Sequence, residues 1–426
     1  MTWLELDKEY VWHPYNSLPS KTKILPVIST NKTSIFLETG EVLIDAMSSW
    51  WSAIHGYNHP KLNNALKKQV EIMPHIMFGG LAHEQASLLS KKLVDLTGLH
   101  GVFLCDSGSV SVEVALKTAI LYQKAKGLKK YKFLALEYAY HGDTLGAMSV
   151  CDPQNSMHSI YGSYMSEHIF TKAPKLGFSS DCSDEIKILE DNFEKYHKEI
   201  AGFIVEPIVQ GAGGMRIYNP EYLKKARELC TKYDVLLILD EIATGFGHTG
   251  LMFAYEHANI KPDILTLGKG LTGGYMPLGV TSCAQFIYDA FVSDDKAKTF
   301  FHGHSYTGNP TACSAALASM DLMEKKETWN NIDRISKKHS TFLNKIKGHK
   351  SIKSIRQTGT ILAIELNTDE HTHYLNNASE KIAAFFIKHG ILSRPLGNVF
   401  YVLPPYCINF SDMDLIYSKT EEFLNQ

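Results

Sequence analysis

The stretch from Val235 to Gly247 reads VLLILDEIATGFG, and the stretch from Asp263 to Gly274 reads DILTLGKGLTGG. In each, a short apolar run leads to a polar residue, which is Asp240 in the first and Lys269, between two glycines, in the second. Apolar runs of this length without alternation are typical of strands buried on both faces of a parallel sheet. Since parallel strands share a direction, the two segments are predicted to end at the same sheet edge.

Asp240 and Lys269 together predict a chemistry that neither predicts alone. An acid after a buried strand is often a helix cap or part of an ion pair, and a lysine between glycines is often solvated. In open α/β sheets, however, ligands bind beyond the carboxyl ends of the strands, so both side chains would face one site. Pyridoxal phosphate needs a lysine that forms a Schiff base and a carboxylate that keeps the pyridine nitrogen protonated. The pair therefore predicts a pyridoxal-phosphate enzyme.

The alternation of apolar strands and amphipathic helices extends over much of the chain. Further strands are predicted at GVFLC (101–105), KFLALE (132–137) and GFIVEP (202–207). Helices are predicted at 59–70, 83–96, 111–123 and 221–233, and another begins near Asn309. This alternation predicts an α/β fold with a mostly parallel sheet covered by helices on both faces.

The C-terminal part of the chain has a different pattern. SIRQTGTILAIEL (354–366) predicts one strand, SEKIAAFFIKHG (379–390) a helix, and ILSRPLGNVFYVLPP (391–405) a pair of strands. We therefore expect a large cofactor-binding domain over 59–325 and a smaller α+β domain over 326–426. The N-terminal segment, 1–58, is expected to join the small domain.

A third segment predicts a place for a phosphate. LCDSGSVSVEVALK (104–117) takes a strand through small residues into a helix. Small residues such as Gly108 and Ser109 let the backbone approach a ligand, and a helix N-terminus offers free N–H groups to an anion. A simple helix cap would explain the same segment equally well. Tyr140, after the next strand, is a candidate to stack on an aromatic ring, although a tyrosine in the core is the usual alternative.

Composition excludes several other classes of protein. The 43 basic and 45 acidic residues give a formal net charge of −2, which favours neither a nucleic acid nor an anionic membrane as partner. No apolar run approaches the roughly 18 residues that predict a membrane span. The seven cysteines are dispersed without a CxxC pair, and the histidines lack metal-ligand spacing. We therefore expect no metal site and a cytoplasmic protein with reduced thiols.

Five segments together resemble the class III aminotransferases, of pyridoxal-phosphate fold type I. They are SGSVSVEVALK (107–117), YHGDTLGAMSV (140–150), EPIVQGAGGM (206–215), LDEIATGFG (239–247) and LGKGLTGG (267–274). The resemblance runs from WHPY near the N-terminus to RPLGNVFYVLPP near the end. It implies that Lys269 is the Schiff-base lysine and Asp240 the partner of the pyridine nitrogen. It also implies that Gly108 and Ser109 hold the cofactor phosphate, with Tyr140 near the ring.

Within this family, VWHPY (11–15) and MSSWWSAIHGYNHP (47–60) are most similar to members of biotin biosynthesis. Those members transfer an amino group from S-adenosylmethionine to 8-amino-7-oxononanoate. The similarity implies a substrate pocket lined by Tyr15, Tyr140 and Trp50, with Tyr15 also in a catalytic role. Arg394 would bind the keto acid's carboxylate, with Trp51 and Tyr401 close by.

FFHGHSYTGNP (300–310) carries a further implication of the resemblance. Gly303 would contact substrate, while His304 and Ser305 would reach the cofactor phosphate of the neighbouring subunit. The protein would then be a homodimer with shared active sites.

Two features leave the amino donor open. KGLTGGYMPLGVT (269–281) and FFHGHSYTGNP look more like relatives that use lysine as donor, whereas the tryptophan pair is usual where adenosylmethionine is the donor. Members of the family also commonly read GFGRTG where this chain reads GFGHTG (245–250). The resemblance implies that the arginine of those members belongs to the polar surroundings of the substrate, and His248 cannot supply its permanently charged fork. Another class III activity on an ω-amine is the alternative within the family.

Two readings outside the family are disfavoured. Residues 245–250 also fit GxGxxG, which would suggest a nicotinamide-binding oxidoreductase. The glycines do not follow the strand at once, however, and that reading leaves Lys269 without a role. A binding or regulatory protein on the same fold would be expected to have lost the lysine, which is present.

Overall fold

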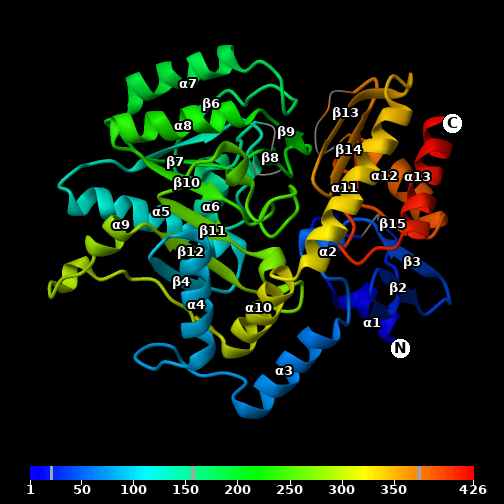
Figure 1. Ribbon diagram of the computed structural model, residues 1–426, viewed down its shortest axis with the longest axis horizontal. Helices are drawn as coiled ribbons and strands as arrows, with labels where there is room; N and C mark the ends of the chain where they lie inside the picture. Colours follow the sequence, from blue (N-terminus) through cyan, green and yellow to red (C-terminus); the bar gives the residue numbers. More distant parts are fainter. Residues whose placement is uncertain (20–22, 155–158, 371, 373–375) are drawn as a thin grey trace.

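The computed structural model describes residues 1–19, 23–154, 159–370, 372 and 376–426. Its largest sheet has seven strands in the order β4-β12-β11-β10-β7-β5-β6 (Figure 1). Their bounds are β4 (Gly101–Cys105), β12 (Gly279–Cys283), β11 (Ile264–Leu267), β10 (Leu236–Asp240), β7 (Ile200–Val205), β5 (Lys132–Leu136) and β6 (Ile169–Thr171). Only β12, which the sequence analysis did not predict, runs antiparallel to its neighbours. The predicted mostly parallel α/β sheet is confirmed.

Successive residues of β10 face two different cores, as the pleat of a strand requires. Leu236 and Ile238 pack in the cluster that contains helix α5 (Gly108–Ala125). Leu237 and Leu239 pack in the cluster that contains α8 (Pro220–Tyr233). Because both faces are covered, an unbroken apolar run forms the strand.

Further helices belong to this part of the molecule (Figure 1). They are α3 (Pro60–Ile72), α4 (Glu84–Thr97), α6 (Leu145–Ser149), α7 (Ser183–Tyr196), α9 (Gln285–Asp289) and α10 (Pro310–Met323). Of these, α6 and α7 connect strands of the sheet. Short 3-10 helices span Ser159–Tyr164, Ala254–Ala258, Lys269–Thr272 and Lys296–Lys298.

The C-terminal part has a three-stranded antiparallel sheet in the order β13-β14-β16. Residues 354–366, predicted as one strand, instead form a hairpin of β13 (Ile352–Thr358) and β14 (Ile361–Leu366). Gly359, with a φ of +50°, lets the chain reverse between them, and its Cα faces Gly250 so closely that a Cβ would collide with that backbone. Helices α11 (Lys326–Ile346), α12 (Ala378–Lys388) and α13 (Phe410–Leu424) complete this part.

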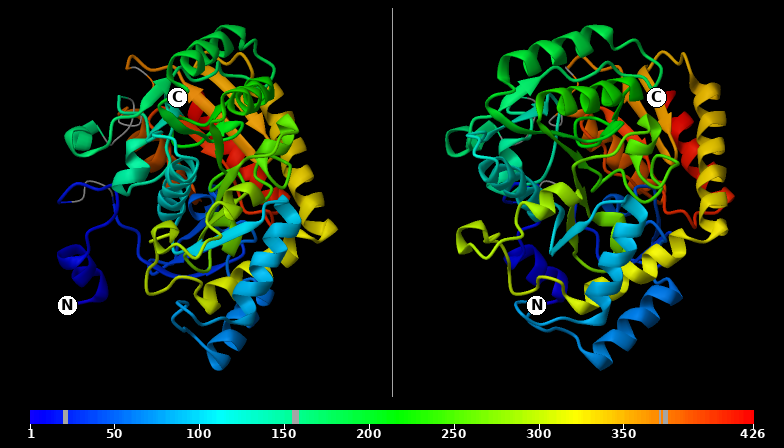
Figure 2. Two further views of the ribbon diagram at one scale, coloured as in Figure 1. Left: turned by 90° about the vertical axis from the view of Figure 1, so that its left-hand side faces the viewer. Right: turned by 60° about the vertical axis from the view of Figure 1, so that its left-hand side comes forward.

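The two chain ends share a four-stranded sheet in the order β1-β2-β3-β15. Its strands are β1 (Val27–Asn31), β2 (Ser34–Leu37), β3 (Val42–Asp45) and β15 (Ile391–Leu392). The predicted pair at 391–405 is thus divided between two sheets, because β15 joins β3 and β16 (Val399–Val402) joins β14. Helix α1 (Trp3–Tyr10) lies at the periphery (Figure 2), with no buried residue. The limits proposed for the domains remain a prediction.

Arg356 joins the small sheet to the large part of the molecule. Its guanidinium is buried and pairs with Glu365 at 2.9 Å, while its Nε donates to the carbonyl of Met215 at 2.7 Å. Met215 lies in the loop between β8 (Val209–Gln210) and β9 (Arg216–Ile217). A buried arginine of the small sheet therefore holds a loop that reaches the candidate site.

Candidate active site

A cavity of about 270 Å³ lies at the carboxyl edge of the large sheet. Asp240 is the last residue of β10, and Lys269 follows β11 at the start of a 3-10 helix. Nine residues that the sequence analysis selected line this cavity: Tyr15, Trp50, Trp51, Gly108, Ser109, Tyr140, Asp240, Lys269 and Arg394. The other lining residues are Ser107, His141, Gly142, Glu206, Gly211, Ala212, Met215, Ile242, Ala243 and Leu396. Residues from both chain ends thus meet at one sheet edge.

The N-terminus of α5 forms a cradle suited to an anion. Ser107 caps the helix, because its hydroxyl accepts a hydrogen bond from the N–H of Val110 at 3.3 Å. Gly108 and Ser109 open the helix, where main-chain N–H groups have no helical partner. A Cβ on Gly108 would lie 2.9 Å from Ile242, so only glycine fits there without a shift. The cradle can therefore bind a phosphate through main-chain donors and the helix dipole.

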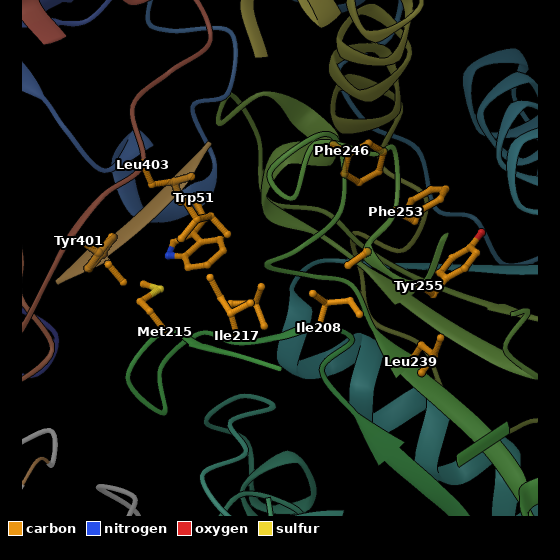
Figure 3. Close-up of a cluster of buried hydrophobic side chains, with 14 of the residues drawn as sticks. Trp51, Ile208, Met215, Ile217, Leu239, Phe246, Phe253, Tyr255, Tyr401 and Leu403 are labelled. Atoms are coloured by element: carbon orange, nitrogen blue, oxygen red, sulfur yellow. The ribbon is translucent and has the colours of Figure 1, made fainter. Parts of the chain in front are cut away.

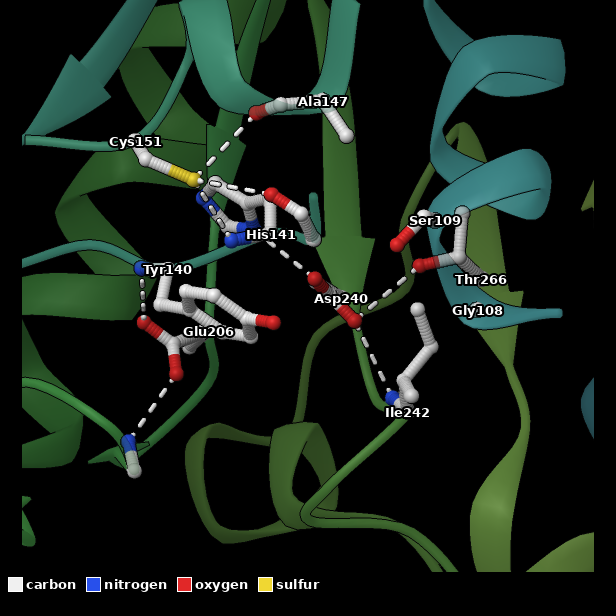
Figure 4. Close-up of polar contacts among 12 residues, drawn as sticks. Gly108, Ser109, Tyr140, His141, Ala147, Cys151, Glu206, Asp240, Ile242 and Thr266 are labelled. Atoms are coloured by element: carbon white, nitrogen blue, oxygen red, sulfur yellow. Dashed lines mark hydrogen bonds and ion pairs between the residues drawn. The ribbon is translucent and has the colours of Figure 1, made fainter. Parts of the chain in front are cut away.

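Three hydrogen bonds hold the buried carboxylate of Asp240 (Figure 4). His141 Nδ1 donates at 2.7 Å, the N–H of Ile242 at 3.1 Å and Thr266 Oγ1 at 3.2 Å. Among the described residues His141 Nε2 has no hydrogen-bond partner. These hydrogen bonds fix the position of Asp240, and one of them comes from a histidine that the sequence analysis did not select.

Lys269 presents its amine to the cavity from a residue with a φ of +42°. Its Nζ lies 5.8 Å from the centre of the Trp51 ring. Enclosure by protein atoms lowers the pKa of this amine, whereas the carboxylates of Asp240 and Glu206 act in the opposite direction. A lowered pKa keeps more of the amine uncharged near neutral pH, and an uncharged amine is the nucleophilic form.

Glu206 directly follows β7, the parallel neighbour of β10, and it is buried. Its carboxyl accepts hydrogen bonds from the N–H of Gly211 at 2.9 Å and of Tyr140 at 3.2 Å. Burial raises the pKa of Glu206 to about 7, although the neighbouring His141 opposes the rise. Glu206 therefore fixes the loop that carries Tyr140 and His141.

The mouth of the cavity is formed by residues far apart in the sequence. Tyr15 Oη donates to Asp143 Oδ2 at 2.5 Å and lies 3.4 Å from Tyr140 Oη. The Arg394 guanidinium lies 4.2 Å from the centre of the Trp50 ring, in a geometry that permits a cation–π contact. Within the described residues no carboxylate forms an ion pair with Arg394, so its planar fork is available to an acidic ligand.

Four predicted residues do not line the cavity. Tyr401, on β16, is buried with Trp51 in the hydrophobic cluster of Figure 3. Gly303, His304 and Ser305 lie in the segment that precedes α10, and His304 Nε2 is 3.8 Å from Asp106 Oδ1. Their roles toward substrate and toward a second subunit remain predictions.

His248 lies outside the cavity lining, behind Trp51. It is 1% exposed and its Nε2 is 2.9 Å from the carbonyl oxygen of Trp51. His248 therefore packs against Trp51, which lines the cavity, and is not itself a lining residue.

The sequence analysis missed the polar cavity residues His141 and Glu206, and also Asp143, which does not line the cavity but bonds to the lining residue Tyr15. A signal for Glu206 was present, because it ends the strand in GFIVEP just as Asp240 ends its own. His141 and Asp143 gave only a weaker signal, their closeness to Tyr140.

Comparison with known proteins identifies similar chains over nearly the full length. A family model described as "Aminotransferase class-III" matches residues 18–424. The adenosylmethionine-8-amino-7-oxononanoate aminotransferase of Buchnera aphidicola subsp. Acyrthosiphon pisum (strain APS) is 44% identical, over 99% of this chain and 97% of its own.

Solved structures show the same similarity. The adenosylmethionine-8-amino-7-oxononanoate aminotransferase of Methanocaldococcus jannaschii DSM 2661 matches with a TM-score of 0.91 at 34% identity, over 98% of both chains. An amine transaminase from an uncultivated Pseudomonas species, in its PLP-bound form, matches with a TM-score of 0.90 at 30% identity. It covers 97% of this chain and 98% of its own. The similarity therefore extends over the whole fold.

Lys269 should be the lysine that reacts with pyridoxal phosphate. Adding the cofactor to cofactor-free protein, reducing with borohydride and mapping the peptides should find the pyridoxyl group on Lys269. Because burial lowers its pKa, labelling of Lys269 should decline at a lower pH than labelling of surface lysines, whose ordinary pKa is about 10.4. Surface lysines in the same digest are the internal control, and the Lys269→Ala protein should lack the pyridoxyl label that persists at lower pH. A dominant label on another lysine would contradict the assignment.

Proposed function

The chain belongs to the class III aminotransferases, and from that membership we propose that it makes 7,8-diaminononanoate in biotin biosynthesis. The amino group would pass from S-adenosylmethionine to the ketone of 8-amino-7-oxononanoate in two half-reactions. Relatives at 42% and 44% identity carry the name adenosylmethionine-8-amino-7-oxononanoate aminotransferase, which supports this acceptor and this donor.

Pyridoxal 5'-phosphate is the cofactor of the family, as the sequence analysis expected, and the cavity has the groups to hold it. The N-terminus of α5 at Gly108 and Ser109 would hold the phosphate, and Asp240 would pair with the protonated ring nitrogen. Lys269 would hold the aldehyde carbon, with Tyr140 beside the ring. When bound, the cofactor supplies an electron-accepting ring that stabilises negative charge on the substrate carbon.

Lys269 is positioned to move protons during both half-reactions. With the cofactor bound, Lys269 Nζ would take a proton from the substrate carbon and return it within the same site. Burial lowers the pKa of this amine, which favours its uncharged, proton-accepting form. Asp240, held by His141 and Thr266, keeps its carboxylate at one place throughout.

The fork of Arg394, which has no ion-pair partner in the part of the chain that the structure describes, is the observation that supports the choice of acceptor. 8-Amino-7-oxononanoate has a carboxylate at one end and an amine beside a ketone at the other. Arg394 at the cavity mouth offers a bidentate partner for the carboxylate. Trp50 and Trp51 offer apolar surface to the methylenes. Asp143, which accepts a hydrogen bond from Tyr15 at the mouth, is an acid that can attract the amine.

The aromatic mouth supports S-adenosylmethionine as the donor. A sulfonium cation and an adenine ring both favour aromatic faces, with cation–π attraction worth about 0.5–2 kcal/mol. Tyr15, Trp50, Trp51 and Tyr140 all line the cavity. Lysine remains the alternative donor, because residues 269–281 and 300–310 resemble relatives that use it. A different ω-amine is less supported, since the amine transaminase neighbour is only 30% identical.

We infer a homodimer with shared active sites from the surface around Gly303. Phe301 is 77% exposed and Tyr306 61%, and Met77 close by is 59% exposed. The 74–81 and 300–309 segments touch, since the Tyr306 ring lies 4.7 Å from that of His75. Exposed apolar side chains on two touching segments favour an interface between subunits. His304 and Ser305 would then reach the partner's cofactor phosphate.

We also propose that the protein works in the cytoplasm. All seven cysteines are free thiols, which suits a reducing compartment. In the part of the chain that the structure describes, every helix is too short or too polar to cross a membrane.

The donor half-reaction should distinguish the two donors. When the cofactor-loaded enzyme is mixed with each donor alone, adenosylmethionine should discharge the cofactor absorbance of the resting enzyme, and lysine should do so far more slowly. A simple alkyl ω-amine serves as control. Faster conversion by lysine at equal concentration would reverse the donor and leave the acceptor proposal intact.

Arg394→Ala should weaken the acceptor half-reaction. A charge-assisted contact is worth about 1.5–3 kcal/mol, so kcat/KM for 8-amino-7-oxononanoate should fall roughly ten- to two-hundred-fold. Arg334→Ala is a matched control, because Arg334 also stacks on an aromatic ring, Phe410, but lies away from the cavity. If Arg394→Ala retains wild-type kcat/KM, another group binds the carboxylate.

Mixing two inactive variants tests the shared site. Lys269→Ala lacks the amine, and His304→Ala/Ser305→Ala lacks the groups assigned to the partner's phosphate. After subunit exchange, hybrid dimers should contain one complete site, giving about a quarter of wild-type activity from an equal mixture. If activity does not return although exchange is verified by mass, His304 and Ser305 do not act across an interface.

A further inference from the structure

The segment Ser48–Trp51 (α2) has an unusual backbone. Its four residues have φ values of +49°, +46°, +57° and +73°, and none of them is glycine. Side chains with a Cβ disfavour this left-handed region, and consecutive residues in it are rarer still. A left-handed turn of four such residues persists only where the surroundings hold it.

This left-handed turn places two indole rings at the cavity. Trp50 lies at the mouth, against the guanidinium of Arg394, and Trp51 lies deeper, with its ring 5.8 Å from Lys269 Nζ. Trp51 is 5% exposed and Trp50 38%. The directions of both Cα–Cβ bonds follow from the backbone, so a change of handedness would move both rings.

The first half of the turn is held by Asp45. Its buried carboxylate accepts hydrogen bonds from the N–H of Met47 at 2.9 Å and of Ser49 at 2.8 Å. Tyr57 Oη donates to the same carboxylate at 2.7 Å. Ser48 Oγ donates to the carbonyl of Leu403 at 2.7 Å, so the small part of the molecule also supports this end.

The second half of the turn is held by His248. A carbonyl oxygen only accepts, so the 2.9 Å contact places the imidazole proton on Nε2, which donates to Trp51 O. The imidazole also meets the Trp51 ring edge-on, with centroids 5.4 Å apart. Burial lowers the pKa of His248 to about 4, which keeps the ring neutral. Thr360 N–H donates to the His248 carbonyl at 2.9 Å and supports it from behind.

We propose that His248 is a positioning residue that clamps the left-handed turn and so keeps Trp51 against Lys269. It acts through Trp51 and contacts no substrate. Trp51 borders the reacting end of the cavity, so both half-reactions depend on the clamp. This inference rests on the proposed function only in that the proposed substrates are used in the assay.

The first test compares His248→Leu, which removes the donor, with His248→Gln, which retains an N–H. His248→Leu should keep its cofactor, because the cradle at Gly108 and Ser109 and the carboxylate of Asp240 are untouched. Its kcat/KM should fall at least about tenfold in both half-reactions, and His248→Gln should regain much of that loss. Acrylamide should quench Trp51 fluorescence more strongly in His248→Leu than in the wild type. The Trp51 signal of each protein is obtained by subtracting the fluorescence of the same protein carrying Trp51→Phe.

A second change separates the clamp from general stability. Glycine enters the left-handed region without a Cβ penalty, so Ser49→Gly should relieve the turn in the His248→Leu protein. Ser49 bonds to Asp45 and Ser52 through main-chain atoms, which glycine keeps, whereas the side-chain hydrogen bond between Ser49 and Tyr57 is lost. Asn259→Gly is the matched control, because Asn259 also has a positive φ, +50°, but lies outside the turn.

Recovery of kcat/KM and of wild-type quenching by Ser49→Gly, and not by Asn259→Gly, would support the clamp. Equal recovery by both glycines, or a His248→Leu protein with wild-type quenching and rates, would overturn it. If His248→Leu does not fold, His248→Phe replaces it in every comparison. Should the wild-type enzyme fail to use 8-amino-7-oxononanoate, the proposed function fails, and the quenching comparison still decides the clamp.

Discussion

The parallel pairing of β7, β10 and β11 is the constraint on which the rest of the site depends. Because these strands run in one direction, Glu206, Asp240 and Lys269 follow their carboxyl ends at a single edge. Charged groups gathered this closely need partners, and main-chain N–H groups, His141 and Thr266 supply them. The sheet therefore concentrates functional groups, and the surrounding loops satisfy them.

Enclosure of the cavity then sets the protonation of its groups. Burial disfavours charge on any group that loses water, so it lowers the pKa of Lys269 and raises that of Glu206. In the same cavity, burial thus favours the uncharged forms of both the Lys269 amine and the Glu206 carboxyl group.

The sequence predicted those features that follow from short-range pattern. Asp240 and Lys269 end apolar runs, and the α/β sheet follows from the alternation around them. Tertiary contacts decided what the pattern missed. Strand β12 runs antiparallel between β4 and β11 and pairs with each of them. The hairpin at Gly359 depends on its close approach to Gly250, and the position of His248 depends on its contact with Trp51. The left-handed turn at Ser48–Trp51 contains no glycine that would have marked it.

The mouth of the cavity brings Tyr15, near the start of the chain, within 5.5 Å of Arg394, near its end. During synthesis the ribosome releases the first of these long before the second. Contacts between such distant residues form late and slow the final folding step. A nascent chain would thus expose the sheet edge and its reactive lysine until the C-terminal residues emerge. Protection of that edge in the cell would depend on the time between completion of the large sheet and arrival of the last strands.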